Sequence, residues 1–273
     1  MSQITRAMQT VSAAKMRRAQ ENVLASRAYA DRIRLMIAGL YGLTDADPGE
    51  FPLLTQRPIQ RIGVVMVTAD KGLAGALNSN VIRRTLNFLD EHREQETQLI
   101  SVGRRGRDFF RRTNVNREAE FINLGDNISV EILRPIIDIA LDDYINERVD
   151  AVDLIYTEFV NTLVQRPVVR RLLPIEPPVE LMAEETIRDF IFEPDRETLL
   201  SALLPRYIEV QVYQAMLEAL ASEHSARMVA MRNATDNALE LIDELTLSYN
   251  KARQTQITRE VSEIAAGAVA LSG

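Results

Sequence analysis

The apolar positions of residues 1–43 follow the period of an α-helix. Ala30, Ile33 and Ile37 are spaced by three and four residues, and neither glycine nor proline occurs before Gly39. Glycine and proline cost a helix interior about 1 and about 3 kcal/mol relative to alanine, so their absence favours an unbroken helix. We therefore expect a long first helix that ends at the glycines beginning with Gly39.

Residues 207–273 have a similar period, with the heptad-like spacing of coiled coils. Ile242, Leu245 and Tyr249 are spaced by three and four residues, and no proline follows Pro205. A helix of this length would span roughly 90 Å. A compact chain of this size has a radius of gyration of only about 19 Å, so the helix is expected to project from the rest of the molecule.

A projecting amphipathic helix needs a partner for its apolar stripe, and the first segment is the candidate. We predict an antiparallel coiled coil of residues 1–43 and 207–273. The first segment carries an excess of basic side chains and the second an excess of acidic ones, which agrees with this pairing. Residues 250–270 extend beyond the partner's reach and are rich in small side chains, which favours insertion into a sleeve formed by another protein.

The middle of the chain, residues 44–206, alternates β-branched runs with helical segments. This alternation predicts a mostly parallel, Rossmann-like α/β domain. The stretch 174–194 is acidic and proline-rich and is expected to be an irregular connection. Strands are predicted at 61–70, 98–103, 119–125, 152–159 and 168–176, and helices at 76–92, 105–113 and 128–146, the last kinked by Pro135.

Composition excludes several classes of function. The chain has no cysteine, which excludes disulfides, thiolate-bound metal centres and thiol switches. A net charge of -7 and the absence of tryptophan disfavour binding to nucleic acid or anionic lipid. No apolar run approaches the ~20 residues of a membrane-spanning helix. The basic N-terminus lacks the apolar core of a secretion signal, and an amphipathic transit peptide is the weaker alternative.

The most enzyme-like feature is the turn Asp70–Gly75, which follows a predicted strand and precedes a predicted helix. Backbone amides in such a turn can cradle a phosphate. The spacing differs from that of a phosphate-binding loop, because Lys71 precedes Gly72 and two residues separate Gly72 from Gly75. We favour a structural turn with an exposed Lys71 and keep a nucleotide site as the alternative.

Other chemistry-bearing residues are interpreted as structural. His224 follows Leu220 by four residues on an apolar stripe, so we expect it to be packed or to face a partner. The basic segment 103–112 favours a solvated helix or contact with an acidic protein. Neighbouring carboxylates on a helix do not face each other, so solvated faces are expected at Asp142 and Asp143, Glu184 and Glu185, and Asp243 and Glu244.

Four segments together carry a family resemblance. They are ITRAMQTVSAAKMRRAQ (4–20), TADKGLAGALN (68–78), ARMVAMRNATDNA (226–238) and LSYNKARQTQITREVSEIAAGA (247–268). They closely resemble the gamma subunits of rotary ATP synthases, and weaker similarity covers most of the remaining chain. The resemblance implies a non-catalytic central rotor. Its coiled coil would stand inside a ring of three alpha and three beta subunits, and its α/β domain would form the foot of the stalk, bound to epsilon and the c ring.

The resemblance also implies contact residues. Lys71 is expected to meet acidic loops of beta. No cofactor is expected on this chain, because in the family ATP, ADP and magnesium bind to alpha and beta. Membrane association would be indirect, on the cytoplasmic face of a bacterial plasma membrane. Contacts with alpha and beta are expected at Met8, Arg227, Arg253, Gln254 and Thr258, and proximity to the c ring at Phe192, Glu193, Pro194 and Asp195.

Two features depart from the family pattern. Family members usually have several more helical turns before the segment that begins at Ile4, so we expect either a truncated start or a shorter first helix. The cysteine-bearing insertion of the chloroplast form is absent, so thiol regulation is not expected. Two other hypotheses remain: an α/β enzyme that binds a phosphorylated ligand at Asp70–Gly75, and a membrane-surface or signalling coiled coil.

Overall fold

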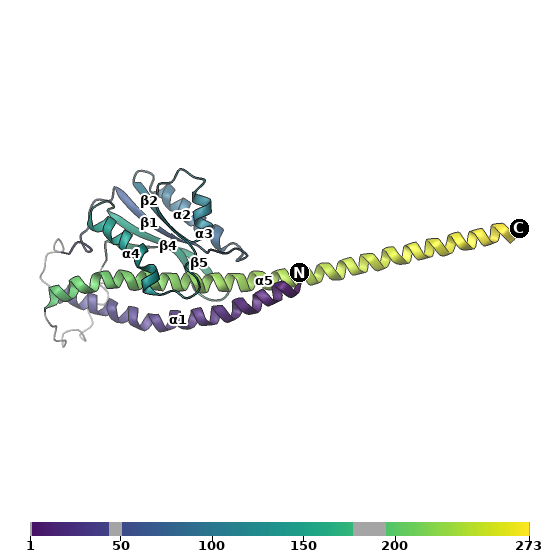
Figure 1. Cartoon of the computed structure of the whole chain (residues 1–273), viewed down its shortest axis with the longest axis horizontal. Coiled ribbons are helices and arrows are strands. Elements are labelled where there is room, and N and C mark those ends of the chain that lie inside the picture. The colour runs from purple at the N-terminus through teal and green to yellow at the C-terminus, as the bar shows by residue number, and fades with distance from the viewer. Residues whose placement is uncertain (1, 44–50, 177–194, 273) are drawn as a thin grey trace.

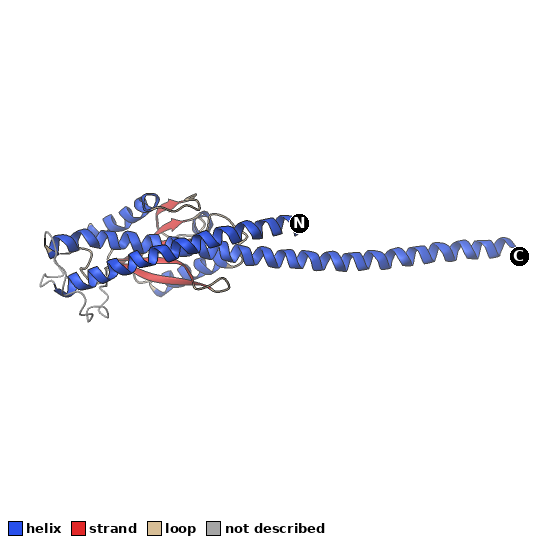
Figure 2. Ribbon diagram, turned by 90° about the horizontal axis from the view of Figure 1, so that it is seen from below, coloured by secondary structure: helices blue, strands red, loops and turns tan. Residues whose placement is uncertain are grey.

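The computed structural model describes residues 2–43, 51–176 and 195–272. An α/β domain lies beside two long helices, α1 (Ser2–Leu43) and α5 (Arg196–Ser272). The two helices run antiparallel and side by side, and α5 then continues alone far beyond the N-terminus (Figures 1 and 2). The hydroxyl groups of Thr5 and Thr235 lie 2.6 Å apart near the point where α1 begins. The predicted antiparallel pairing is confirmed.

Helix α5 begins earlier than the expected start at Tyr207. Asp195 caps it, because its carboxylate accepts hydrogen bonds of 2.8 Å from both the backbone N–H and the hydroxyl of Thr198. Pro205 lies inside the helix, so treating it as the boundary was wrong. Burial of Leu204 and Ile208 on either side offsets the lost backbone hydrogen bond of the proline. Similarly, α1 continues past Gly39 to Leu43.

The middle of the chain forms a five-stranded sheet in the order β3-β2-β1-β4-β5. Four strands are parallel, and β5 is antiparallel to β4. Val65 at the sheet centre pairs with Ile100 on one side and Leu154 on the other. The mostly parallel sheet is therefore confirmed. The strands are β1 (Arg61–Val67), β2 (Glu96–Val102), β3 (Arg117–Phe121), β4 (Ala151–Phe159) and β5 (Gln165–Leu173).

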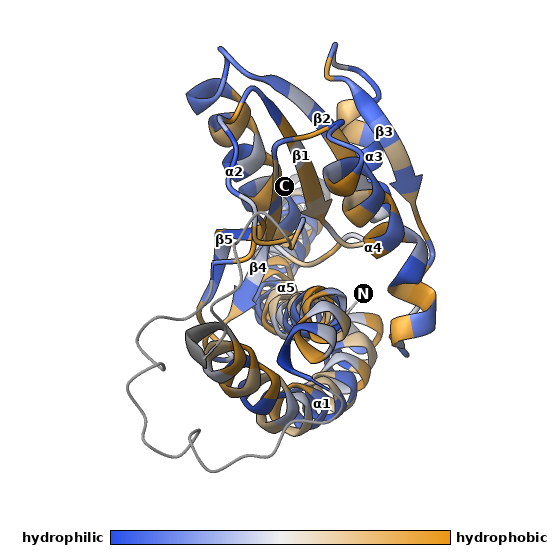
Figure 3. Cartoon of the chain, turned by 90° about the vertical axis from the view of Figure 1, so that its left-hand side faces the viewer, coloured by the Kyte–Doolittle hydropathy of each residue, from blue (hydrophilic) through white to orange (hydrophobic). Residues whose placement is uncertain are grey.

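Helices cover both faces of this sheet, as Figure 3 shows from the end of the molecule. Helices α2 (Leu77–Glu91) and α3 (Arg104–Phe110) pack on one face. Helix α4 (Val130–Ile145) and the coiled coil cover the other. On that face, Ile37 of α1 and Ile208 of α5 belong to the same buried cluster as the sheet residues. The coiled coil and the α/β domain therefore share one core.

Candidate partner-contact surfaces

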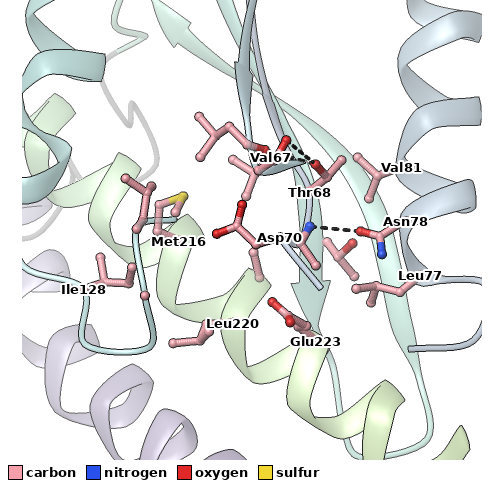
Figure 4. A pocket seen from close by; sticks show the side chains of 17 residues that line it. Val67, Thr68, Asp70, Leu77, Asn78, Val81, Ile128, Met216, Leu220 and Glu223 are labelled. Carbon is pink, nitrogen blue, oxygen red and sulfur yellow. Dashed lines mark hydrogen bonds between the residues drawn. The ribbon is translucent and has the colours of Figure 1, made fainter. Parts of the chain in front are cut away.

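The carboxyl ends of the parallel strands meet at one edge of the sheet, and α5 crosses that edge. In doubly wound folds this edge is the usual place for a ligand. Here a cavity of about 50 Å³ remains between the strand ends and α5 (Figure 4). Ligand pockets typically measure about 300–1,000 Å³. The carboxylates of Asp70 and Glu223 also line the cavity, and their charge is unfavourable for a phosphate.

Two backbone amides at this edge already have a partner. The carboxylate of Asp70 accepts hydrogen bonds from the backbone N–H groups of Arg104 at 2.9 Å and Asn123 at 2.8 Å. It thus occupies two backbone donors at this edge. A side chain at Gly72 would place Cβ 2.4 Å from the guanidinium of Arg105, so this glycine permits close packing. The geometry favours a structural turn over a nucleotide site.

Three of the expected contact residues lie around one groove. Met8 of α1, Lys71 of the turn and Arg227 of α5 line a cavity of about 420 Å³. Its other walls are largely apolar and include Val11 and Leu73. The backbone of Leu73 has φ of 64°, in the left-handed region that non-glycine residues rarely adopt, and its side chain is 62% exposed. Sequence reasoning did not identify this exposed apolar residue.

Arg227 is buried and bonded within the chain. Its Nη2 lies 2.5 Å from Oε1 of Glu223, and its Nε and Nη2 each donate to the carbonyl oxygen of Gly72 at 3.3 Å. Burial raises the pKa of Glu223, and the adjacent guanidinium opposes that rise. Arg227 therefore fixes the turn Asp70–Gly75 against α5, in addition to lining the groove.

His224 is packed, as its place on the apolar stripe predicted. Burial lowers its pKa to about 4, so the ring is neutral at pH 7. Its Nε2 lies 3.7 Å from Oδ1 of Asp126, and Nζ of Lys15 lies 2.5 Å from Oδ2 of the same carboxylate. Burial opposes ionisation of Asp126, but the Lys15 ammonium holds the pKa of that carboxyl below its usual value. Sequence reasoning missed this bridge between α1 and α5.

The remaining contact residues lie far from the groove. Arg253, Gln254 and Thr258 are exposed on the part of α5 that extends beyond α1. Large apolar side chains are exposed on several faces of the same segment, since Leu241 and Ile242 are adjacent and both about half exposed. Other exposed apolar residues of the segment, hereafter the bare shaft (239–264), are Leu239, Leu245, Leu247, Tyr249, Ile257, Val261 and Ile264.

The expected c-ring end is described only in part. Asp195 is exposed at the start of α5, opposite the bare shaft, whereas Phe192, Glu193 and Pro194 lie outside the described residues, as do Glu184 and Glu185.

Among the neighbouring carboxylates, Asp142, Asp243 and Glu244 are exposed as predicted. Asp143 is buried and paired with Arg148 at 2.6 Å, so the prediction of a solvated Asp143 was wrong. Its carboxylate lies at the end of α4, where it faces the following turn.

Two findings apply to the described residues alone. They contain no cluster of three or more histidine, aspartate or glutamate side chains that could hold a metal ion. None of their helices is both long and apolar enough to span a membrane.

Comparisons with known proteins identify the family. A family model described as ATP synthase matches residues 1–271. The ATP synthase gamma chains of Roseiflexus sp. (strain RS-1) and Chloroflexus aurantiacus are 52% and 48% identical to this chain, and the alignments cover 100% and 99% of it and 94% of each relative.

Solved structures show the same architecture. The central stalk and c-ring structure of Tetrahymena thermophila mitochondrial ATP synthase matches with a TM-score of 0.66 and 25% identity, over 85% of this chain and 99% of that chain. The rotor of Euglena gracilis mitochondrial ATP synthase shares the fold, with a TM-score of 0.62 and 21% identity, over 94% of this chain and 93% of that chain. The chain therefore belongs to the family of ATP synthase gamma chains and is a subunit of the central rotor stalk.

Proposed function

We propose that this chain is a non-catalytic shaft that couples proton-driven rotation of a c ring to ATP synthesis in beta subunits. The observation that carries the proposal is the bare shaft. Its helix continues alone past α1 with apolar side chains exposed on several faces. An isolated helix in water is only marginally stable, so this segment needs enclosure by other proteins.

A ring of three alpha and three beta subunits would supply that enclosure. Arg253, Gln254 and Thr258 provide hydrogen-bonding groups among the apolar side chains of the bare shaft. The shaft is also asymmetric about its long axis, because α1 lies along one side of α5. Turning an asymmetric shaft changes which beta subunit it contacts. Such a difference in contact between states is what coupling requires.

The groove at the base of the shaft would form a second contact with the ring. Lys71 is exposed at its rim, where its ammonium would meet acidic loops of beta, and Met8 supplies an apolar wall. The α/β domain and the start of α5 near Asp195 would face epsilon and the c ring. Membrane association would then be indirect, at the cytoplasmic face of a bacterial plasma membrane, and ATP, ADP and magnesium would bind to alpha and beta.

Co-expression with alpha and beta subunits of the same organism tests this proposal. We expect a complex with one copy of this chain per three alpha–beta pairs, and ATP hydrolysis that depends on its presence. A chain that stays separate from alpha and beta, and that binds a phosphorylated ligand in a manner abolished by Lys71→Ala, would overturn the proposal in favour of an enzyme.

A further inference from the structure

A short stretch of α5 is surrounded by polar contacts at the point where it leaves the α/β domain. Three loops reach it, each following the carboxyl end of a parallel strand: the loops after β1, β3 and β4. We call this arrangement the polar collar. It consists of Ser222, Glu223, His224, Ser225 and Arg227 of α5, together with Asp126 of the loop after β3.

The two serines contact the end of β4 and the turn that follows it. The hydroxyl of Ser222 donates to the carbonyl oxygen of Thr157 at 3.2 Å, and that of Ser225 donates to the carbonyl oxygen of Thr162 at 2.7 Å. Both serines are completely buried. A hydrogen bond weakens steeply as its angle departs from linear, so these contacts depend on the rotation of α5 about its own axis.

The other contacts come from different directions. Arg227 donates to the carbonyl oxygen of Gly72 in the loop after β1. His224 faces Asp126 in the loop after β3, and Lys15 brings α1 to the same carboxylate. The collar therefore ties α5 to three loops and, through Asp126, to α1.

Buried polar groups of this kind contribute little net stability: replacing a whole buried pair by apolar residues is often neutral, although removing one charged partner alone is costly. Their best-attested role is to specify register, as a single buried asparagine does in a coiled coil. Nearer the start of α5, before the collar, the packing of the helix is apolar at residues such as Leu204, Ile208 and Leu217. Apolar contacts are non-directional and tolerate small rotations that a set of hydrogen bonds does not.

We propose that the polar collar fixes the rotational phase of the shaft relative to the α/β domain. Its members are positioning residues: they hold the angle at which the bare shaft leaves the domain, and torque crosses the junction at that angle. The contacts of the collar lie within one chain, so the fixed angle does not depend on the proposed function. Only the transmission of torque at that angle rests on the proposed function.

The test follows the angle through a distance between the α/β domain and the bare shaft. The chain has no cysteine, so cysteines introduced at the exposed residues Asn87 of α2 and Ser248 of the bare shaft accept spin labels without background. The labelled full chain is measured alone and after assembly with alpha and beta subunits. Distance distributions are compared for the unaltered collar, Ser222→Ala with Ser225→Ala, and Asp126→Asn. Two controls are Ser201→Ala, on an exposed face of α5, and Asp126→Glu, which keeps the charge.

We expect broader or shifted distances for the double serine variant and for Asp126→Asn. Both controls should give distances close to those of the unaltered collar. All variants should have similar melting temperatures. A probe attached to the α/β domain of a stalled complex should likewise show larger angular fluctuations for the two collar variants. Unchanged distances and fluctuations in both variants would overturn the collar proposal. Failure of the unaltered chain to assemble with alpha and beta would count against the proposed function instead. The distances measured in the free chain would still test the collar proposal.

Discussion

His224 and Glu223 are adjacent on α5, and burial disfavours the charged form of both. It lowers the pKa of the imidazole to about 4 and raises the pKa of the carboxyl, against the attraction of Arg227. The two groups therefore respond to acid in opposite senses. Protonation of Glu223 relieves a buried charge, whereas protonation of His224 creates one.

Lowering the pH from 7 to 5 is predicted to destabilise the full chain through His224. The pKa of the folded state lies below the ordinary value of 6.5, so the unfolded chain binds the proton more readily. The stability that depends on the neutral ring is present above pH 6.5 and is lost as the pH falls towards 4. Between pH 7 and pH 5, we expect the free energy of unfolding, measured with urea, to fall by about 2 kcal/mol less in His224→Gln than in the wild type. Equal losses would contradict this.

Replacing Arg227 by methionine is predicted to lower the free energy of unfolding by about 3 kcal/mol, because Glu223 would remain buried without its partner. Arg232→Met is a matched control. Its ion pair with Asp236 is exposed and 4.0 Å long, so its loss should cost at most about 1 kcal/mol. Denaturant unfolding of both variants measures the difference. Equal effects would show that burial of the Arg227 pair is unimportant.

The environment of a single residue could be predicted from the sequence only where the pattern of its own segment indicated it. The apolar stripe indicated that His224 is packed. Asp126 gave no signal, because it lies in a loop and its contact with Lys15 joins residues 111 positions apart. The prediction for Asp143 was wrong for a similar reason. It considered only the neighbouring helix position, whereas the partner, Arg148, lies in the turn after the helix.

At the scale of elements, periodicity and alternation predicted every strand and helix of the described chain, with boundaries shifted by several residues. The largest error was the start of α5 at Arg196 instead of Tyr207. Proline is a strong local signal, but packing of Leu200, Leu204 and Ile208 in the core overrides it. Local propensity does not contain the tertiary contacts that hold a helix together across a proline.

Pro205→Ala is therefore predicted to stabilise the chain. Alanine restores the backbone donor missing at this position and removes the clash of the proline ring with the preceding turn. We expect a gain of about 1–3 kcal/mol in the free energy of unfolding. Ser201→Ala, on an exposed face of the same helix, should change it by less than about 0.5 kcal/mol. Destabilisation by Pro205→Ala would mean that the helix depends on the proline geometry here.

At the scale of the whole molecule, the coiled coil is continuous with the core of the α/β domain, while the bare shaft projects beyond both. The sequence predicted the projecting helix from its length alone. It did not predict that α5 closes the carboxyl edge of the sheet, because that arrangement depends on contacts such as the one between Arg227 and Gly72, 155 positions apart.

The bare shaft is predicted to be the least protected helix of the free chain. Without tertiary packing its backbone hydrogen bonds open readily, whereas those of α5 beside the sheet are held by the core. Hydrogen exchange should therefore be fast over residues 239–264 in the free chain and slow after assembly with alpha and beta subunits. Residues 204–221 serve as the internal control and should be protected in both states. Unchanged fast exchange in the complex would argue against enclosure of the shaft.

Rotation is the most direct test of the account. A complex of this chain with alpha and beta subunits would be immobilised through beta, with an optical probe attached to a cysteine at Asn87 in the α/β domain. We expect added ATP to drive continuous rotation of the probe in one direction, and rotation to stop when ATP is exhausted. A complex that hydrolyses ATP at the same rate while the probe stays at a fixed angle would contradict the claim that this chain is the rotor.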